Sequence, residues 1–232
     1  MNTRITSRSA FTLLELLVVL AVIGILLGVV ATYTSGAKEK ARSVECKKNL
    51  GDWAKGLGML VDDSRTHSFP AAGSGAAKDE KAWYNTIARY VDVKPLKDYE
   101  EGEKMPVPNA GIKSVYVCPA ANNRTSSGDL FSYSYNSHLN PDGKTLRASN
   151  VKNASELVAF MDAPRASAYS ADETMVLSET TDSFRHGGMM NIAFCDGHVG
   201  SFKKHQVLQG SETPSKVNNF GILWDPSGES EN

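Results

Sequence analysis

The sequence predicts an α+β fold in which one long N-terminal α-helix packs on a small antiparallel β-sheet, with loop-rich insertions between the elements. Three observations support this prediction. An apolar stretch of helical length lies near the start, an amphipathic helical pattern follows it, and short apolar runs separated by Gly, Asn, Asp and Pro occupy the second half. Such elements bury their apolar faces by packing a sheet against a helix.

The apolar stretch covers residues 11–30, and Glu15 is its only charged residue. Its length matches the roughly 20 residues that a helix needs to cross a bilayer, whereas a soluble core helix rarely stays apolar on every face. Residues 1–10 carry Arg4 and Arg8 and no acidic residue. Because basic residues stay on the cytoplasmic side, we expect a single-pass helix in the inner membrane, with a cytoplasmic N-terminus and an external or periplasmic C-terminal domain.

A secretory signal peptide normally has its small-residue cleavage site after the apolar region, and no such site follows Val30. The small residues Ser9 and Ala10 instead precede it. This pattern favours cleavage at the cytoplasmic face and retention of the apolar helix.

The run FTLLELLVVLAVIGIL, residues 11–26, closely resembles the class III signal of type IV pilins and type II secretion pseudopilins. The resemblance implies a pilin-like fold and a leader, residues 1–10, that prepilin peptidase removes between Ala10 and Phe11. It also implies methylation of the Phe11 amine by the same enzyme and packing of the helix with other pilin-like subunits in a filament. Ala10 stands where the family usually has Gly, and Thr32 stands where many relatives have proline.

Within the predicted membrane and filament-core helix, residues 11–31, Glu15 requires a compensating partner. A carboxylate in an apolar helix costs about 2.5 kcal/mol or more unless it is paired. In an assembled bundle the Phe11 ammonium of a neighbouring subunit could approach Glu15 and fix the register. The alternative is that Glu15 stays hydrated near the interface. Gly24 and Gly28 form a small-xxx-small pair that would let another helix approach closely.

Residues 32–63 continue the helix as an exposed amphipathic half. The apolar residues recur mostly three or four apart, at Ala37, Ala41, Val44, Leu50, Trp53, Leu57 and Leu60. We expect this stripe to face the core of an external α+β domain formed by residues 64–225. Residues 226–232 are expected to be a solvated tail.

A second short helix is expected around Trp83 and Tyr90. The predicted strands are Ser114–Cys118, Phe131–Tyr135, Leu157–Met161, Asn191–Cys195 and His198–Phe202. The dipeptide Asp196-Gly197 suits a two-residue type I′ turn between the last two strands, which would place Cys195 opposite His198.

The charge balance excludes a general attraction to nucleic acid. Lysine and arginine total 25 against 26 acidic residues, which gives a net charge of −1. The charged side of the amphipathic helix is therefore expected to be a solvated surface. The expected contacts are membrane lipid, prepilin peptidase and other subunits, with no nucleic-acid partner.

Three cysteines, Cys46, Cys118 and Cys195, allow one disulfide in three pairings. In an oxidising compartment, a Cys46–Cys118 bridge would tie the helix to the globular part. The alternative is that all three are small buried apolar side chains.

Nine residues separate His186 from Asp196-Gly197. With Cys118-Pro119 and the CKKNL run at residues 46–50, this spacing resembles the H-X9-DG group of prepilin-type proteins. His186, Asp196 and His198 could bind a divalent metal if the loop before the hairpin folds back. The alternative assigns Asp196-Gly197 to the turn and His186 to a hydrogen bond with a backbone carbonyl.

Some pseudopilins hold a structural calcium ion in a C-terminal loop. The acidic residues that could serve here are Asp172, Glu173, Asp182 and Asp196, although no EF-hand pattern is present. No other cofactor is expected.

Motifs of hydrolases, nucleotide-binding proteins and metalloproteases are missing from the sequence, so no catalytic residue is predicted. The leading hypothesis is a structural filament subunit and not an enzyme. The second is a membrane-anchored module that binds carbohydrate or protein through the loop-rich region 64–185. The third is an external metal-dependent enzyme built on His186, Asp196 and His198.

Overall fold

The structure, a computed structural model, describes most of the chain after the predicted leader. The described residues are 12–107, 111–121, 130–141, 144, 146–164, 168–178, 183–209 and 215–227, without the side chains of residues 30–35 and 177. The predicted leader 1–10 with Ala10, the predicted cleavage and methylation residue Phe11, the calcium candidate Asp182 and most of the predicted tail lie outside these ranges. The chain divides into two compact units, residues 1–40 and 41–232.

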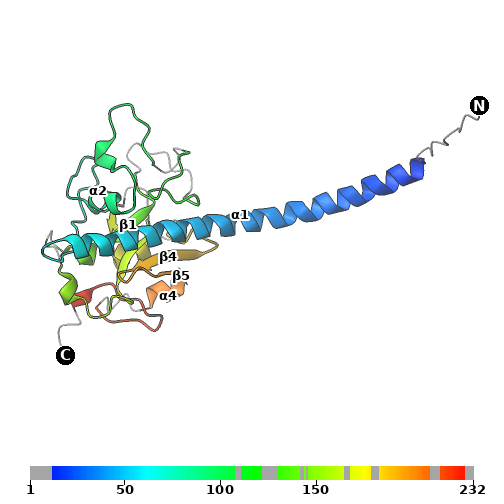
Figure 1. Cartoon of the computed structure of the whole chain (residues 1–232). Coiled ribbons are helices and arrows are strands. Elements are labelled where there is room, and N and C mark those ends of the chain that lie inside the picture. Colours follow the sequence, from blue (N-terminus) through cyan, green and yellow to red (C-terminus); the bar gives the residue numbers. More distant parts are fainter. Residues whose placement is uncertain are drawn as a thin grey trace, which may run out of the picture. The chain divides into compact units, whose positions relative to one another are not determined.

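The elements alternate between one long helix, short helical turns and short strands (Figure 1). The helices are α1 (Leu13–Asp63), α2 (Trp83–Thr86), α3 (Glu173–Ser178) and α4 (Lys204–Leu208), with 3-10 turns η1 (Ala88–Tyr90), η2 (Leu96–Asp98), η3 (Ser137–Leu139) and η5 (Ala148–Asn150). The strands are β1 (Tyr133–Asn136), β2 (Val158–Asp162), β3 (Ser170–Ala171), β4 (Met189–Phe194) and β5 (Val199–Lys203).

Helix α1 contains 51 residues and ends at Asp63, where the amphipathic pattern also ends. The helix is therefore continuous through the apolar and amphipathic segments. In the described part of the chain, no helix is both long and apolar enough to cross a membrane, so the membrane helix expected at 11–31 stays a proposal.

The five strands form one sheet in the order β3-β1-β2-β4-β5. Every pairing is antiparallel except that of β1 with β3. The prediction of an α+β fold with a mostly antiparallel sheet is confirmed, and four of the five predicted strands overlap observed ones. The two-residue strand β3 was not predicted, because it is too short to show an alternating pattern.

The strand predicted at Ser114–Cys118 is wrong. Side chains of α1, not a neighbouring strand, bind the carbonyl groups of this segment. Asn49 Nδ2 donates to the Val117 carbonyl at 3.0 Å, and Trp53 Nε1 donates to the Val115 carbonyl at 2.9 Å. The short apolar run here packs against a helix, and the sequence pattern does not distinguish such packing from pairing in a sheet.

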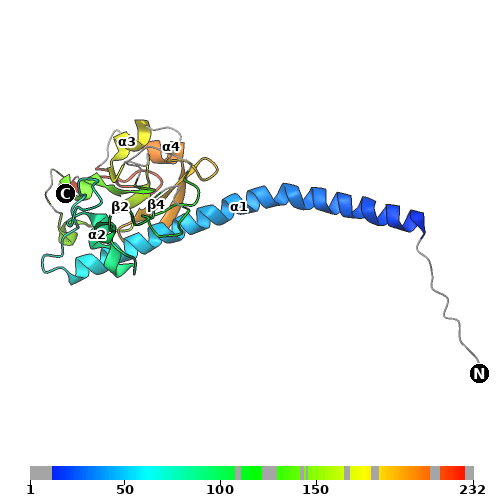
Figure 2. The same ribbon diagram turned by 90° about the horizontal axis from the view of Figure 1, so that it is seen from above.

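Both faces of the sheet are buried in separate apolar clusters. The part of α1 after Ala41 covers one face, where Trp53 packs edge-on against Trp83 of α2 with ring centroids 5.0 Å apart. Helices α3 and α4 cover the other face, on which Val176 and Val207 pack against strand residues. Figure 2 shows the sheet between these helical layers.

Candidate functional site

Thr12 and Glu15 close the N-terminal turn of α1 through reciprocal hydrogen bonds. The Thr12 amide and hydroxyl both donate to Glu15 Oε2 at 2.9 Å, and the Glu15 amide donates to Thr12 Oγ1 at 3.3 Å. This arrangement is a capping box, which satisfies amides that the first turn of a helix leaves without partners. Glu15 therefore has a partner in its own chain, while its pairing with a neighbouring subunit stays a prediction.

The surface of α1 after this cap is apolar and exposed. Leu14 is 73% exposed and Ile25 is 69% exposed. A Cβ atom added at Gly24 or Gly28 would meet no other atom within 4 Å. An apolar surface of this extent indicates a site of contact with lipid or with another protein.

A disulfide joins α1 to the segment 111–121. Cys46 and Cys118, the pair considered from the sequence, are bonded across a separation of 72 residues, with Cα atoms 5.0 Å apart. Asn49, about one turn further along α1, also donates to the Tyr133 hydroxyl at 3.3 Å. Burial raises the pKa of Tyr133, so the phenol stays neutral. Helix and sheet are thus held together by covalent and polar contacts at one junction.

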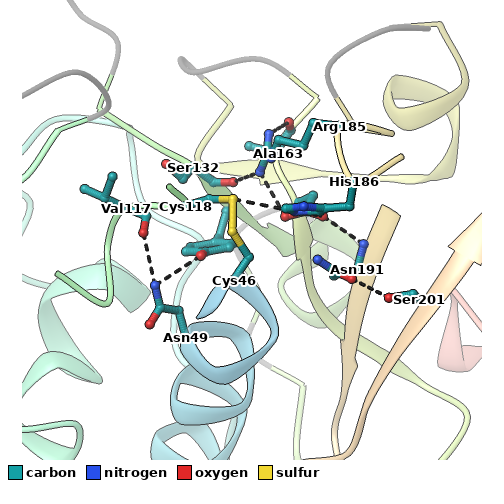
Figure 3. The surroundings of a disulfide bond; sticks show 12 residues. Cys46, Asn49, Val117, Cys118, Ser132, Ala163, Arg185, His186, Asn191 and Ser201 are labelled. Atoms are coloured by element: carbon teal, nitrogen blue, oxygen red, sulfur yellow. Dashed lines mark hydrogen bonds and ion pairs between the residues drawn. A yellow bond between two sulfur atoms is a disulfide. The ribbon is translucent and has the colours of Figure 1, made fainter. Parts of the chain in front are cut away.

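His186 lies beside this disulfide, in the interior of the domain. Its Nε2 is 3.6 Å from Cys118 Sγ and 3.3 Å from Asp162 Oδ2, and its side chain is fully buried. Figure 3 shows the His186 ring directed toward Cys118. Nδ1 has no hydrogen-bond partner among the described residues. We therefore assign the proton to Nε2, where it faces both the sulfur and the carboxylate.

Asp162, at the end of β2, organises the polar groups around His186. Its Oδ1 accepts a bond from Arg185 Nη2 at 3.0 Å, and its Oδ2 accepts one from the Asn191 amide at 2.8 Å. The Arg185 guanidinium also donates to the carbonyls of Ala163, at 3.1 Å, and Ser132. The carboxylate and the guanidinium balance each other inside the domain, so this buried charge is paired and bonded.

A tight turn carries His186 into the interior. The amides and carbonyls of His186 and Met189 bond each other reciprocally at 3.2 Å. Gly187 and Gly188 between them have φ angles of 62° and 81°. Positive φ at both central positions is the requirement of a type I′ turn, which glycine meets without a steric cost. A turn of this type was predicted at Asp196-Gly197 instead.

The loop at Asp196-Gly197 contains three residues, so the predicted two-residue turn is wrong. The Phe194 amide donates to the His198 carbonyl at 3.0 Å and the Gly197 amide donates to the Phe194 carbonyl at 2.9 Å. Gly197 alone in this loop has a positive φ, of 94°. This is a type I turn followed by a glycine bulge. Phe194, not Cys195, is opposite His198, and their rings stack with centroids 4.2 Å apart.

The metal ligands proposed from the sequence are not brought together. His186 is buried beside Cys118, whereas His198 and Asp196 are exposed and bond each other, with Nδ1 2.7 Å from Oδ1. Among the described residues, one group of three His, Cys, Asp or Glu side chains lies close enough to share an ion. Its members are Cys46, Cys118 and His186.

The described calcium candidates have local partners instead of a shared centre. Asp172 Oδ1 accepts bonds from the Thr174 hydroxyl at 2.7 Å and the Met175 amide at 2.8 Å, at the start of α3. Glu173 Oε2 lies 2.8 Å from His138 Nε2. Each carboxylate therefore has a local structural role.

The comparisons bear on the N-terminal segment. The prokaryotic N-terminal methylation motif matches residues 5–31. The match includes the predicted cleavage residues, Glu15, Gly24 and Gly28, and it indicates a type IV pilin-like protein that prepilin peptidase processes. It also indicates a structural subunit with a membrane-anchored N-terminus. Comparison of the chain with curated proteins and with solved structures finds no match.

Three residues that surround the motif histidine His186 were not predicted from the sequence: Asp162, Arg185 and Asn191. Asp162 follows an apolar run and resembles the start of a loop. Arg185 lies 23 residues away from it and resembles a surface charge. The available signal was Arg185-His186-Gly187-Gly188, in which two glycines predict a tight turn directly after two groups able to bind a carboxylate.

Proposed function

We propose that the chain is a structural subunit, either a pseudopilin or a minor pilin, of a type II secretion or type IV pilus-like filament. Prepilin peptidase cleaves it between Ala10 and Phe11 and methylates the Phe11 amine. The subunit resides in the inner membrane with its N-terminus in the cytoplasm and its domain outside, and then enters the filament. The methylation motif at residues 5–31 carries this proposal, and the exposed apolar surface of α1 supports it.

The mass of the mature protein tests the processing. Purified from its native membrane, the chain should lack residues 1–10 and carry one additional methyl group on Phe11. Replacement of Phe11 by another apolar residue should leave cleavage intact. A full-length N-terminus in the native host would contradict the proposal.

The capping box sharpens the assembly test at Glu15. Glu15→Gln keeps an oxygen that can accept the Thr12 bonds but removes the charge, whereas Thr12→Val removes the hydroxyl and keeps the charge. If Glu15 pairs with a neighbouring Phe11 ammonium, Glu15→Gln should abolish incorporation into filaments and Thr12→Val should largely retain it. The reverse order would assign Glu15 to capping alone. Both variants should remain in the membrane fraction.

We also assign the chain to the H-X9-DG group, because the two parts of that motif lie at the two ends of β4. His186 starts the turn that leads into the strand, and Asp196-Gly197 forms the loop that leaves it. The motif would then specify where one central strand begins and ends, with its histidine fixed beside a buried carboxylate.

A second candidate function is an external binding module, which one cavity favours. A cavity of about 490 Å³ is lined by His138, Leu146 and other residues of the loop-rich region, together with Asp225 and the two residues that follow it. Its polar and apolar lining suits a sugar ring. Leu146→Trp would place a bulky ring in the cavity and obstruct it. The binding module would be supported if the wild-type chain binds a glycan and Leu146→Trp loses this binding while it still enters the filament. If the wild-type chain binds no member of a broad glycan panel, this second function is contradicted.

A further inference from the structure

The sulfur atoms of the disulfide and a ring nitrogen of His186 have the arrangement of a metal site. The ligand atoms of Cys46, Cys118 and His186 all lie within 4.8 Å of one another, and the three side chains are buried. Asp162 Oδ2 lies 3.3 Å from the same His186 nitrogen. Two sulfur atoms and one ring nitrogen therefore lie close enough to share an ion, and a carboxylate oxygen lies beside that nitrogen.

This donor set is typical of Zn²⁺ and other thiophilic divalent ions. Zinc binds thiolate, imidazole and carboxylate in tetrahedral sites of four ligands. The carboxylate is already oriented, because the Asn191 amide and the Arg185 guanidinium bind it. Metal sites depend on such outer contacts to position their ligands.

The charges of the core also balance with an ion present. Two thiolates and Asp162 contribute three negative charges, whereas a divalent ion and Arg185 contribute three positive charges. In the disulfide form, Asp162 and Arg185 form an ion pair. A divalent ion would offset the two negative charges of the thiolates, which would be strongly unfavourable if they were buried without a cation.

We propose that the reduced chain binds one thiophilic divalent ion, of the Zn²⁺ class, through Cys46, Cys118 and His186, with Asp162 as the fourth ligand. Binding releases the two thiol protons and leaves the imidazole proton on Nδ1, so that Nε2 faces the ion. The disulfide and the metal site are alternative states of one junction, because the same sulfur atoms form both. Each state holds α1 against the segment 111–121.

A cavity lies beside the junction, on the side of Cys118. It has a volume of about 370 Å³, and Cys118 lines it together with Glu45 and Lys113. The proposal does not depend on the filament role, since it concerns only residues of the domain.

Cobalt binding by the full-length chain in detergent tests the proposal. Anaerobic reduction with a phosphine converts the disulfide and one water into two thiols and a phosphine oxide. After removal of the reductant, one equivalent of Co²⁺ should produce thiolate-to-cobalt charge-transfer absorption, which Zn²⁺ should abolish. The oxidised chain should show no such absorption. Absence of this absorption from reduced, folded protein would refute the site.

Three variants assign the ligands. Cys195→Ser is the matched control, because its thiol lies outside the group of ligands, and it should bind like the wild type. Cys118→Ser should lose the charge-transfer band, and His186→Gln, which keeps both thiols, should weaken binding at least tenfold. Circular dichroism and the melting transition should show that each reduced variant is folded. Unchanged affinity in His186→Gln, or loss of the band in Cys195→Ser, would overturn the assignment.

Discussion

The Asp162 carboxylate and the Arg185 guanidinium form an ion pair inside the domain, with Oδ1 and Nη2 3.0 Å apart. The carboxylate is fully buried and the arginine side chain is 8% exposed. The pair connects the end of β2 to the turn that precedes β4. It therefore joins segments that are adjacent in the sheet but separated along the chain.

Removal of one member of this pair should destabilise the domain strongly. Asp162→Ala leaves the guanidinium buried without its carboxylate, and such changes typically cost about 3–5 kcal/mol. The free energy of unfolding, measured by urea titration, should fall by this amount. The double variant Asp162→Leu/Arg185→Met should recover part of the loss. A double variant as unstable as the two single changes combined would show that the pair does not act as a unit.

The disulfide should contribute about 4 kcal/mol to the free energy of unfolding, because it closes a separation of 72 residues in the unfolded chain. The double variant Cys46→Ala/Cys118→Ala should show this loss in urea titrations under oxidising conditions. Cys195→Ala provides the control for loss of one small side chain. Equal stability of the double variant and the oxidised wild type would contradict the prediction.

The stability of the domain should depend on pH through His138. Its Nε2 lies 2.8 Å from Glu173 and its Nδ1 lies 3.9 Å from Asp225. Burial opposes protonation, but the bond to Glu173 and the nearby carboxylates of Asp225 and Asp172 outweigh it and raise the pKa of His138 above 6.5.

A raised pKa means that the folded chain holds the proton more tightly than the unfolded chain. The stabilisation is therefore fully present below pH 6.5 and is lost as the pH rises through the higher pKa of the folded state. The urea midpoint should fall over this range in the wild type. In His138→Gln the decrease should be smaller, and an unchanged pH profile would remove His138 from this role.

Replacement of glycine by alanine should change the stability of the domain in opposite directions at Gly197 and Gly58. Gly197 has a φ of 94°, so Gly197→Ala forces a side chain into the left-handed region at a cost of about 1–2 kcal/mol. Gly58 lies in α1, and a Cβ there meets nothing within 4 Å. Gly58→Ala should therefore stabilise the helix by up to about 1 kcal/mol. Thermal unfolding of the two variants would reveal the contrast.

Local patterns predicted the elements that are long or regularly spaced. The stripe containing Leu50, Trp53 and Leu57 identified α1 because its period follows directly from helical geometry. Four strands were found because their short apolar runs are bounded by turn residues. Segment 114–118 was assigned wrongly, because its polar backbone groups are satisfied by Asn49 and Trp53 from a distant part of the chain.

The buried site was harder to predict because its parts meet only after folding. The Asn191 amide lies 29 residues from Asp162, and the Cys118 sulfur lies 68 residues from His186. Spacing along the sequence suggested that His186 would join Asp196 and His198. The turn at Gly187-Gly188 instead directs the histidine inward, while the hairpin loop stays exposed.

The position of the disulfide has a mechanical consequence. Cys46 is the first fully buried residue of α1 among those described, and its bond leads directly to Cys118. A pulling force applied to the N-terminal part of the helix and resisted by the later strands would pass through the two sulfur atoms. The covalent path of that tension would bypass residues 47–117. In an oxidised subunit under load, the disulfide would thus prevent the chain between the two cysteines from being pulled out. The subunit would therefore extend less when it is stretched.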